Sequence, residues 1–369
     1  MGKSPFCRQH TKNTRSLCDA SPSGRLTKLL WLWISALVAT SGVGVLPAAD
    51  EIPKPGEIFP AKDTLNCDRD AREDAQNCLD GLRWNPGDFT VTCEAAKGDQ
   101  GDLLIRFPTP VPTGDGINDN VSMEWYVARD AERNPKSANC VIVVHESGRG
   151  MTVGRIFARG LNSQGLHTFL VHLPGYGVRR SAESDKPERI LTGMRQAIAD
   201  VRRARDAAVT LPLVKSEVVG LQGTSLGGFI TSTTAGLDSG FDRVFILLAG
   251  GNLHEVVLNG KKDAAQFRQR LGSIGVRGDQ IRELARPVEP MRVAHRLNPS
   301  TTWLYSGQYD DVVPPACSKA LAEAANLPDG HHIEMAADHY SGILYLPAVI
   351  AQIRSRMEKS PGSGESLPD

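Results

Sequence analysis

The chain has 369 residues and a mass of 39.9 kDa, and 40% of its residues are hydrophobic. That content fills a sizeable core and excludes disorder as the main state. Its 42 Lys and Arg balance 42 Asp and Glu, so the chain lacks the basic field that nucleic-acid binding needs. The balance conceals an asymmetry, because residues 1–49 carry six basic side chains and one acidic side chain, which leaves the remainder acidic.

The N-terminal segment has the pattern of an export signal. Basic residues precede an uncharged stretch, residues 29–49, that opens with large apolar side chains and ends in small ones. We expect residues 1–49 to be a signal peptide cleaved near Ala48 or Ala49, or else an uncleaved membrane anchor. Both alternatives predict an exported protein, periplasmic or secreted, that meets a membrane only through residues 29–49 if these stay uncleaved.

Five cysteines follow this leader, so at least one of them is unpaired. In an oxidising compartment the close pair Cys67 and Cys78 is the expected disulfide, whereas Cys140 and Cys317 could equally be buried thiols. The sequence has no C-x-x-C and no H-E-x-x-H motif, so we expect no metal site. Glycines 148, 150 and 154 are spaced too widely for a dinucleotide fingerprint, and no cofactor is expected.

Residues 50–85 are first Pro-rich and then charged, which predicts a linker followed by an arm with a short helix near residues 68–74. From residue 86 the pattern changes to short β-rich runs separated by Gly, Pro and Asp. These runs are residues 89–93, 103–107 and 121–126. Because short turns join them, we expect them to form an antiparallel edge of a sheet.

Near-continuous apolar runs follow and predict strands that are covered on both faces. They are residues 140–144, 168–171, 218–221 and 244–248. Helical periodicity appears from residue 187, through Ile190 and Met194, and again from residue 343 to about 357. The alternation predicts an α/β fold over residues 86–357, with three layers, a mostly parallel central sheet and antiparallel N-terminal edge strands. The tail, residues 358–369, is expected to be disordered.

One motif within this alternation indicates chemistry. Gly223, Ser225 and Gly227 form a G-x-S-x-G pattern between a buried strand and a helix. A serine on a sharp strand-to-helix turn needs small residues two before and two after it, because larger side chains would collide with neighbouring backbone. We therefore expect Ser225 to be a nucleophile, beside the free backbone N–H of Leu226.

A serine nucleophile needs a base, and the base needs an acid that orients it. Residues 301–306 predict a strand that ends in a Gly turn, with the acids Asp310 and Asp311 just beyond it. A last strand then precedes a loop that carries His339. The order Ser, Asp, His along the chain is the order found on an α/β-hydrolase sheet.

With these features, residues from about 86 to 357 resemble the α/β-hydrolase superfamily, nearest to its dienelactone-hydrolase-like and prolyl-oligopeptidase-like serine esterases. In that family a G-x-x-D-x-x-V-P stretch holds the acid of the triad. Residues 307–314 match it with Asp310 in the acid position, which leaves Asp311 as the alternative. The loop at His339 resembles the family's histidine loop, so the resemblance makes His339 the base.

The resemblance also implies an oxyanion hole. The family's oxyanion loop follows the third strand, and here the Glu146 backbone N–H would join that of Leu226 in stabilising a tetrahedral oxyanion. The Glu146 carboxylate could instead contact Ser225 or position a substrate. His145 and His172 end strands near the site, and they are expected either to support it or contact substrate, or to be hydrogen-bonded core histidines.

Residues 252–298 lie where family members insert a lid, and their arginines could favour an anionic substrate or form a solvated helical face. The resemblance implies an exported serine hydrolase that cleaves a carboxylic ester, of a small molecule or a polysaccharide, through an acyl-enzyme. One alternative is a prolyl-oligopeptidase-type peptidase, although the arm before residue 86 is too short for the propeller of those enzymes. The other is a non-catalytic cell-envelope binding module on a hydrolase scaffold.

Overall fold

The structure is a computed structural model that describes residues 51–183, 186 and 189–358. The expected leader with its cleavage site, and the tail from residue 359 onward, lie outside the described residues. Among the helices that are described, none is long and apolar enough to cross a membrane.

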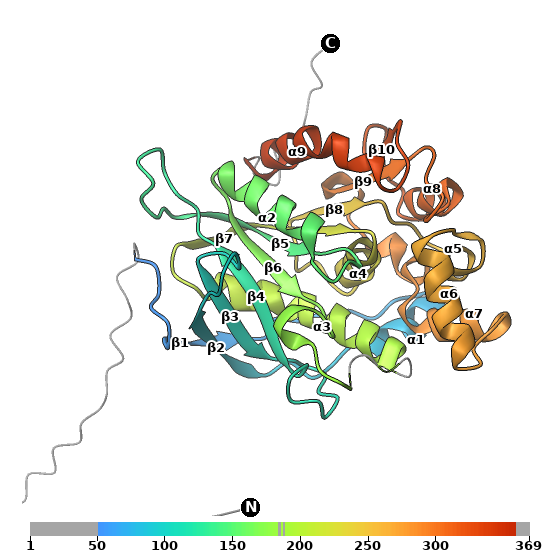
Figure 1. Ribbon diagram of the computed structural model, residues 1–369, viewed down its shortest axis with the longest axis horizontal. Coiled ribbons are helices and arrows are strands. Elements are labelled where there is room, and N and C mark those ends of the chain that lie inside the picture. The colour runs from blue at the N-terminus through green and yellow to red at the C-terminus, as the bar shows by residue number, and fades with distance from the viewer. Residues whose placement is uncertain (1–50, 184–185, 187–188, 359–369) are drawn as a thin grey trace, which may run out of the picture. The chain divides into compact units, whose positions relative to one another are not determined.

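Within the described residues, ten strands form one sheet in the order β1-β2-β3-β4-β6-β5-β7-β8-β9-β10 (Figure 1). The strands are β1 (Ile58–Lys62), β2 (Asp88–Ala95), β3 (Leu103–Pro108), β4 (Asn120–Tyr126), β5 (Ala138–Val144), β6 (His167–His172), β7 (Val214–Thr224), β8 (Arg243–Leu247), β9 (Thr302–Gly307) and β10 (His332–Met335). From β1 to β6 each spatial neighbour pairs antiparallel, and from β6 to β10 each pairs in parallel. The predicted sheet, mostly parallel with antiparallel N-terminal edge strands, is confirmed.

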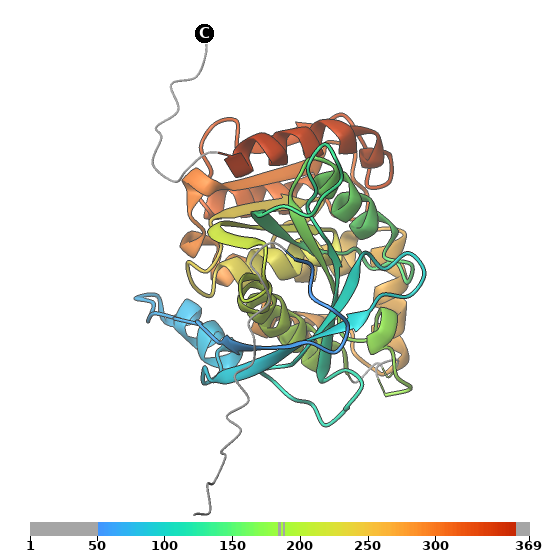
Figure 2. The same cartoon turned by 90° about the vertical axis from the view of Figure 1, so that its left-hand side faces the viewer.

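Helices cover both faces of this sheet. The α-helices are α1 (Glu73–Leu82), α2 (Thr152–Ser163), α3 (Ile190–Val209), α4 (Leu226–Ala235), α5 (Leu253–Asn259), α6 (Asp263–Ser273), α7 (Asp279–Ala285), α8 (Pro315–Ala324) and α9 (Leu346–Glu358). Short 3₁₀ segments are η1 (Gly177–Arg179), η3 (Arg286–Val288), η4 (Pro290–Arg292), η5 (Ala294–Arg296), η6 (Pro299–Thr301) and η7 (Ser341–Tyr345). In Figure 2 the sheet lies between α2 and α9 (green and red) on one side and α3 (yellow-green) on the other.

The two faces of the sheet have separate apolar cores, and β5 shows why. Side chains alternate across a strand, so Cys140, Ile142 and Val144 pack on the face of α3 and α4, while Val141 and Val143 pack against α2 and α9. Every residue of β6, β8 and β9 is buried, as expected for strands covered on both faces. These continuous apolar runs are the reason why the sequence predicts the parallel strands well.

The segment expected as a linker and arm contributes to the same unit. β1 was not predicted, yet it pairs antiparallel with β2, from Ile58 opposite Thr92 to Lys62 opposite Asp88. It is an edge strand with Pro60 at its centre, and a sheet tolerates proline only at such an edge. The expected short helix is α1, which begins later than predicted, at Glu73.

The expected disulfide between Cys67 and Cys78 is absent, and both residues are free thiols, as are Cys93, Cys140 and Cys317. Cys78 lies on the buried face of α1, where its Sγ is 3.6 Å from the carbonyl oxygen of Pro287. Burial raises the pKa of the Cys78 thiol to about 11. The disulfide prediction was wrong because α1 turns this side chain into the core, while Cys67 precedes the helix.

Candidate active site

Ser225 lies between β7 and α4, where the chain turns sharply at the carboxyl end of the parallel strands. Its backbone has φ 53° and ψ −115°, a conformation that residues with a side chain rarely adopt. A Cβ on Gly227 would lie 2.2 Å from the carbonyl oxygen of Val144, and one on Gly223 would lie 2.2 Å from the carbonyl oxygen of Gly227. The turn therefore needs glycine at both positions, and it raises the serine hydroxyl above the sheet.

The structure brings Ser225, His339 and Asp310 together. His339 Nε2 lies 3.0 Å from Ser225 Oγ, and His339 Nδ1 lies 2.7 Å from Asp310 Oδ2. His339 comes from the loop after β10 and Asp310 from the loop after β9, and both side chains are buried. This line of hydrogen bonds can pass the serine proton to the imidazole while a carboxylate orients the ring.

The acid loop distinguishes Asp310 from its neighbour. The second oxygen of Asp310, Oδ1, accepts the backbone N–H groups of Val312 at 2.9 Å and Val313 at 2.8 Å. Asp311 points elsewhere and forms an ion pair with Lys262, whose Nζ lies 3.0 Å from Asp311 Oδ1. The structure thus places Asp310, and not Asp311, against the histidine.

Two backbone N–H groups border the serine. Within the described part of the chain, neither the N–H of Glu146 nor that of Leu226 has a hydrogen-bond acceptor, and both residues line the same cavity as Ser225. The Glu146 carboxylate, in contrast, accepts the N–H groups of Val153 at 3.2 Å and Gly154 at 3.0 Å in the first turn of α2. A helix N-terminus binds a carboxylate well, so this side chain anchors the loop and does not contact Ser225.

His145 connects this loop to the loop after β6. Its Nε2 accepts the backbone N–H of Leu173 at 3.2 Å, so its Nδ1 must carry the hydrogen that is donated to Glu146 O at 2.6 Å. Its ring packs on Tyr176, with centroids 4.6 Å apart. Burial lowers the pKa of His145 to about 3, so the ring is neutral. The structure thus shows His145 as a buried, hydrogen-bonded histidine that joins the loop after β5 to the loop after β6.

His172 lies in a buried polar cluster that the sequence did not predict. Its Nε2 is 2.9 Å from Glu124 Oε1, and Glu124 also accepts hydrogen bonds from Arg155 and Tyr126 at 2.7 Å each. Burial by itself would raise the pKa of Glu124, but the bonds from His172 and Arg155 outweigh it and lower the pKa to about 2. The signal for this cluster in the sequence was Glu124, a single acid inside the mostly apolar run over residues 121–126.

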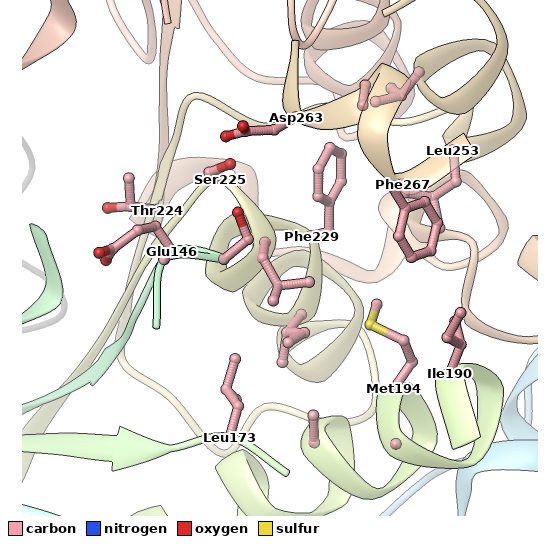
Figure 3. A pocket seen from close by; sticks show the side chains of 18 of the residues that line it. Glu146, Leu173, Ile190, Met194, Thr224, Ser225, Phe229, Leu253, Asp263 and Phe267 are labelled. Atoms are coloured by element: carbon pink, nitrogen blue, oxygen red, sulfur yellow. The ribbon is translucent and has the colours of Figure 1, made fainter. Parts of the chain in front are cut away.

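A cavity of about 900 Å³ opens beside Ser225 and His339. One wall comes from α3 and α4, and another comes from residues 252–298, which form α5, α6, α7 and short 3₁₀ segments and are here called the cap. Figure 3 shows Ser225 and Glu146 toward one side of the cavity and Phe267 and Leu253 of the cap on the opposite side. Apolar side chains in its lining include Leu173, Ile190, Met194, Phe229, Leu253, Val256, Val257, Phe267, Leu271 and Ile281.

The arginines of the cap have mostly structural partners. Arg286 and Arg292 bond to the Asp74 carboxylate of α1, and Arg268 donates to carbonyl oxygens within the cap. Arg270 is exposed and lines the cavity. Arg268 and Arg292 are partly buried against these partners, whereas the Arg286 side chain is 54% exposed and remains solvated.

No group of three or more His, Cys, Asp and Glu in the described ranges is arranged to hold a metal ion. At the cavity lie the Ser225 hydroxyl, the His339 imidazole and the backbone N–H groups of Glu146 and Leu226, with the Asp310 carboxylate behind the imidazole.

Comparisons with known proteins give similarity at the level of the fold. No family model and no curated protein matches the sequence. The structure is similar to the acetyl xylan esterase from Paenibacillus sp. R4, with a TM-score of 0.54 and 15% identity over 79% of this chain and 96% of that one. It is also similar to the Pyrococcus horikoshii acylaminoacyl peptidase, with a TM-score of 0.52 and 10% identity over 76% of this chain and 49% of that one. With its sheet order, its strand-to-helix serine turn and these neighbours, the chain has the α/β-hydrolase fold.

Proposed function

We propose that this chain is a serine hydrolase that cleaves a carboxylic ester through an acyl-enzyme. The observation that carries the proposal is the continuous hydrogen-bonded line from Ser225 through His339 to Asp310, which opens onto a large apolar cavity. A hydroxyl, a base and an orienting acid in this geometry are the parts that nucleophilic acyl transfer requires.

The reaction follows from the positions of these groups. As Ser225 Oγ attacks the ester carbonyl, His339 Nε2 takes the hydroxyl proton, and Asp310 stabilises the imidazolium through Nδ1–H. The N–H groups of Leu226 and Glu146 donate to the oxyanion that forms. His339 then returns the proton to the departing alcohol. A water molecule attacks the acyl-enzyme with His339 as base, which releases the acid and restores Ser225.

A peptidase of the prolyl-oligopeptidase type is the main alternative. Those enzymes resemble this chain in the hydrolase domain, and residues 51–85 are where an access-restricting domain would begin. Here those residues form β1 and α1 of the sheet unit. Because these residues are part of the sheet unit, they do not form a domain that would restrict access to peptides. We therefore favour ester hydrolysis over peptide hydrolysis.

The triad is tested with a fluorophosphonate probe and p-nitrophenyl esters on the purified protein, with an acylaminoacyl p-nitroanilide as the peptidase substrate. We expect labelling and ester turnover, both lost in Ser225→Ala. Ser163→Ala, on the exposed side of α2, is the matched control and should retain both. Labelling that persists in Ser225→Ala would overturn the nucleophile. Anilide cleavage without ester cleavage would favour the peptidase, and no labelling at all would favour a binding module.

We also propose that the protein is exported, because a basic start and the uncharged stretch at residues 29–49 are typical of an export signal. The test is fractionation of bacterial cells that express the whole chain, followed by N-terminal sequencing. A periplasmic or secreted product that begins near residue 49 supports cleavage, and an intact chain in the membrane fraction supports an anchor. An intact chain confined to the cytoplasm would overturn export.

A further inference from the structure

The cavity beside Ser225 is far larger than an ester bond requires. At about 900 Å³ it falls near the upper end of the roughly 300–1,000 Å³ range typical of pockets that enclose a whole small ligand. An acetyl group would occupy only a small part of this volume, so the size of the cavity favours a bulkier acyl group.

The far side of the cavity is apolar and comes from two parts of the fold. Ile190 and Met194 on α3 face Leu253 and Phe267 of the cap across the cavity, and Phe229 on α4 lies between these residues and Ser225 (Figure 3). The first four side chains are only partly buried in the described chain. Their remaining apolar surface borders the cavity, where an apolar ligand would remove it from water.

The charged residues that line the cavity have other partners or lie at exposed positions. Lys186 pairs with Glu183 at 2.7 Å, and Arg189 donates to the carbonyl oxygen of Thr113 at 3.4 Å. Arg270 is exposed. The half-buried Asp263, which Figure 3 shows near Ser225, would repel an anion there, and the far wall between α3 and the cap is apolar.

We propose that this cavity holds the apolar acyl chain of the substrate, and that the protein hydrolyses esters of medium- and long-chain fatty acids in preference to acetate esters. The inference rests on the proposed ester hydrolysis and names its substrate class. The alcohol leaves from the side of Ser225 that the cap does not cover, and the chain lies between α3 and the cap.

The first test measures kcat/KM for p-nitrophenyl acetate, butyrate, hexanoate, octanoate and palmitate, all below their micelle concentrations. Burial of each added methylene should raise kcat/KM by up to about fourfold until the chain reaches the end of the cavity, so hexanoate and octanoate should both exceed acetate. A parallel series of acetate esters with lengthening alcohols should be flat. A flat acyl series, or a rise in the alcohol series alone, would overturn the proposal.

The second test fills the cavity. Met194→Trp on α3 and Leu253→Trp in the cap should each lower the octanoate-to-acetate ratio of kcat/KM about tenfold, because the indole takes the place of the chain. Gln269→Trp, on an exposed part of α6 outside the lining, is the matched control and should leave the ratio unchanged.

Fluorophosphonate labelling distinguishes a wrong acyl site from a wrong assignment of hydrolase activity. If both tryptophan variants are labelled but keep the wild-type ratio, the acyl site is wrong while the hydrolase stands. If the wild-type protein is neither labelled nor active on any ester in the series, the proposed function itself fails.

Discussion

The strands of the central sheet and the helices of the cap are built in different ways. β6, β8 and β9 bury every residue, whereas α6, with eleven residues, buries only Ala264 and Leu271. The sheet draws its stability from continuous apolar burial on two faces. The cap adds a small apolar cluster of its own and arginine contacts with carbonyl oxygens and with Asp74, while others of its apolar residues, such as Val256 and Val293, pack into the main core.

The sheet positions the candidate catalytic side chains, whereas the cap shapes the cavity that would select the substrate. Ser225, Asp310 and His339 all follow strands of the well-packed sheet, so their backbone is held firmly. The cap contributes one wall of the cavity and none of the three side chains. Loops and added segments can change without disturbing a catalytic geometry that a rigid sheet positions.

The largest effect is expected where the sheet presents its acid. Asp310→Asn should lower kcat by about 10⁴-fold, because the amide cannot stabilise the imidazolium and favours the wrong tautomer of His339. Asp311→Asn, one residue further and paired with Lys262, should change kcat by less than about tenfold. Steady-state kinetics on one ester checks both variants. Equal losses would show that the acid is not Asp310 alone.

Glycine substitutions should separate the two regions by stability. Gly227→Ala should destabilise the protein by about 3 kcal/mol or more, because its Cβ would lie 2.2 Å from the carbonyl oxygen of Val144. Gly272→Ala in α6 has room, with its first neighbour 3.8 Å away on the flexible Arg277 side chain. A helical alanine should therefore stabilise it by about 0.5–1 kcal/mol. Urea unfolding measures both, and a tolerated Gly227→Ala would contradict the tight turn.

Low pH should destabilise the protein through two buried histidines, one in the sheet and one directly after a strand. Burial lowers the pKa of His145 to about 3 and that of His167 to about 4 in the folded protein. In the unfolded chain the pKa of a histidine is about 6.5. Because the folded pKa is depressed, this contribution to stability is complete above about pH 6.5 and is lost as the pH falls toward 3–4. Each ring should contribute a slope of about 1.4 kcal/mol per pH unit. Urea unfolding at pH 7.5, 6 and 5 tests this.

His167 offers the matched variant for that experiment. Its Nδ1 accepts the Ala128 N–H at 3.0 Å, and its Nε2 donates to the carbonyl oxygens of Lys136 and Leu213 at 3.0 Å each. His167→Gln should be less stable at every pH but lose less stability between pH 6 and 5 than the parent. If the parent protein had the same free energy of unfolding at pH 7.5 and pH 5, the assignment of these buried histidines as neutral would be refuted.

The smallest effect is expected at the junction between the cap and the catalytic loops. Lys262 pairs with Asp311, and its Nζ also lies 4.8 Å from the centre of the Tyr340 ring. The pair is partly exposed and screened by solvent, so Lys262→Met should change KM by a few-fold at most and leave kcat nearly unchanged. Steady-state kinetics on octanoate and acetate esters gives the split. A large loss of kcat would mean that the cap supports the chemistry after all.

Prediction from the sequence succeeded where one local pattern carries the information. Apolar runs indicate buried strands, and glycines on both sides of a serine between strand and helix indicate a sharp turn. The chain order of Ser225, Asp310 and His339 then followed from the family pattern. It failed at Cys67 and Cys78, and it missed β1, because a five-residue run with Pro60 at its centre resembles a linker until β2 pairs with it.

The sequence by itself thus determined the alternating α/β pattern and the candidate nucleophile, acid and base, since burial and turn geometry leave local signatures. Only the tertiary structure decided between Asp310 and Asp311, gave the Glu146 carboxylate to α2, and enclosed an apolar cavity between α3 and the cap. These features depend on contacts between residues far apart in the chain. No local periodicity encodes such contacts, because each partner's pattern is compatible with several arrangements until the whole chain packs.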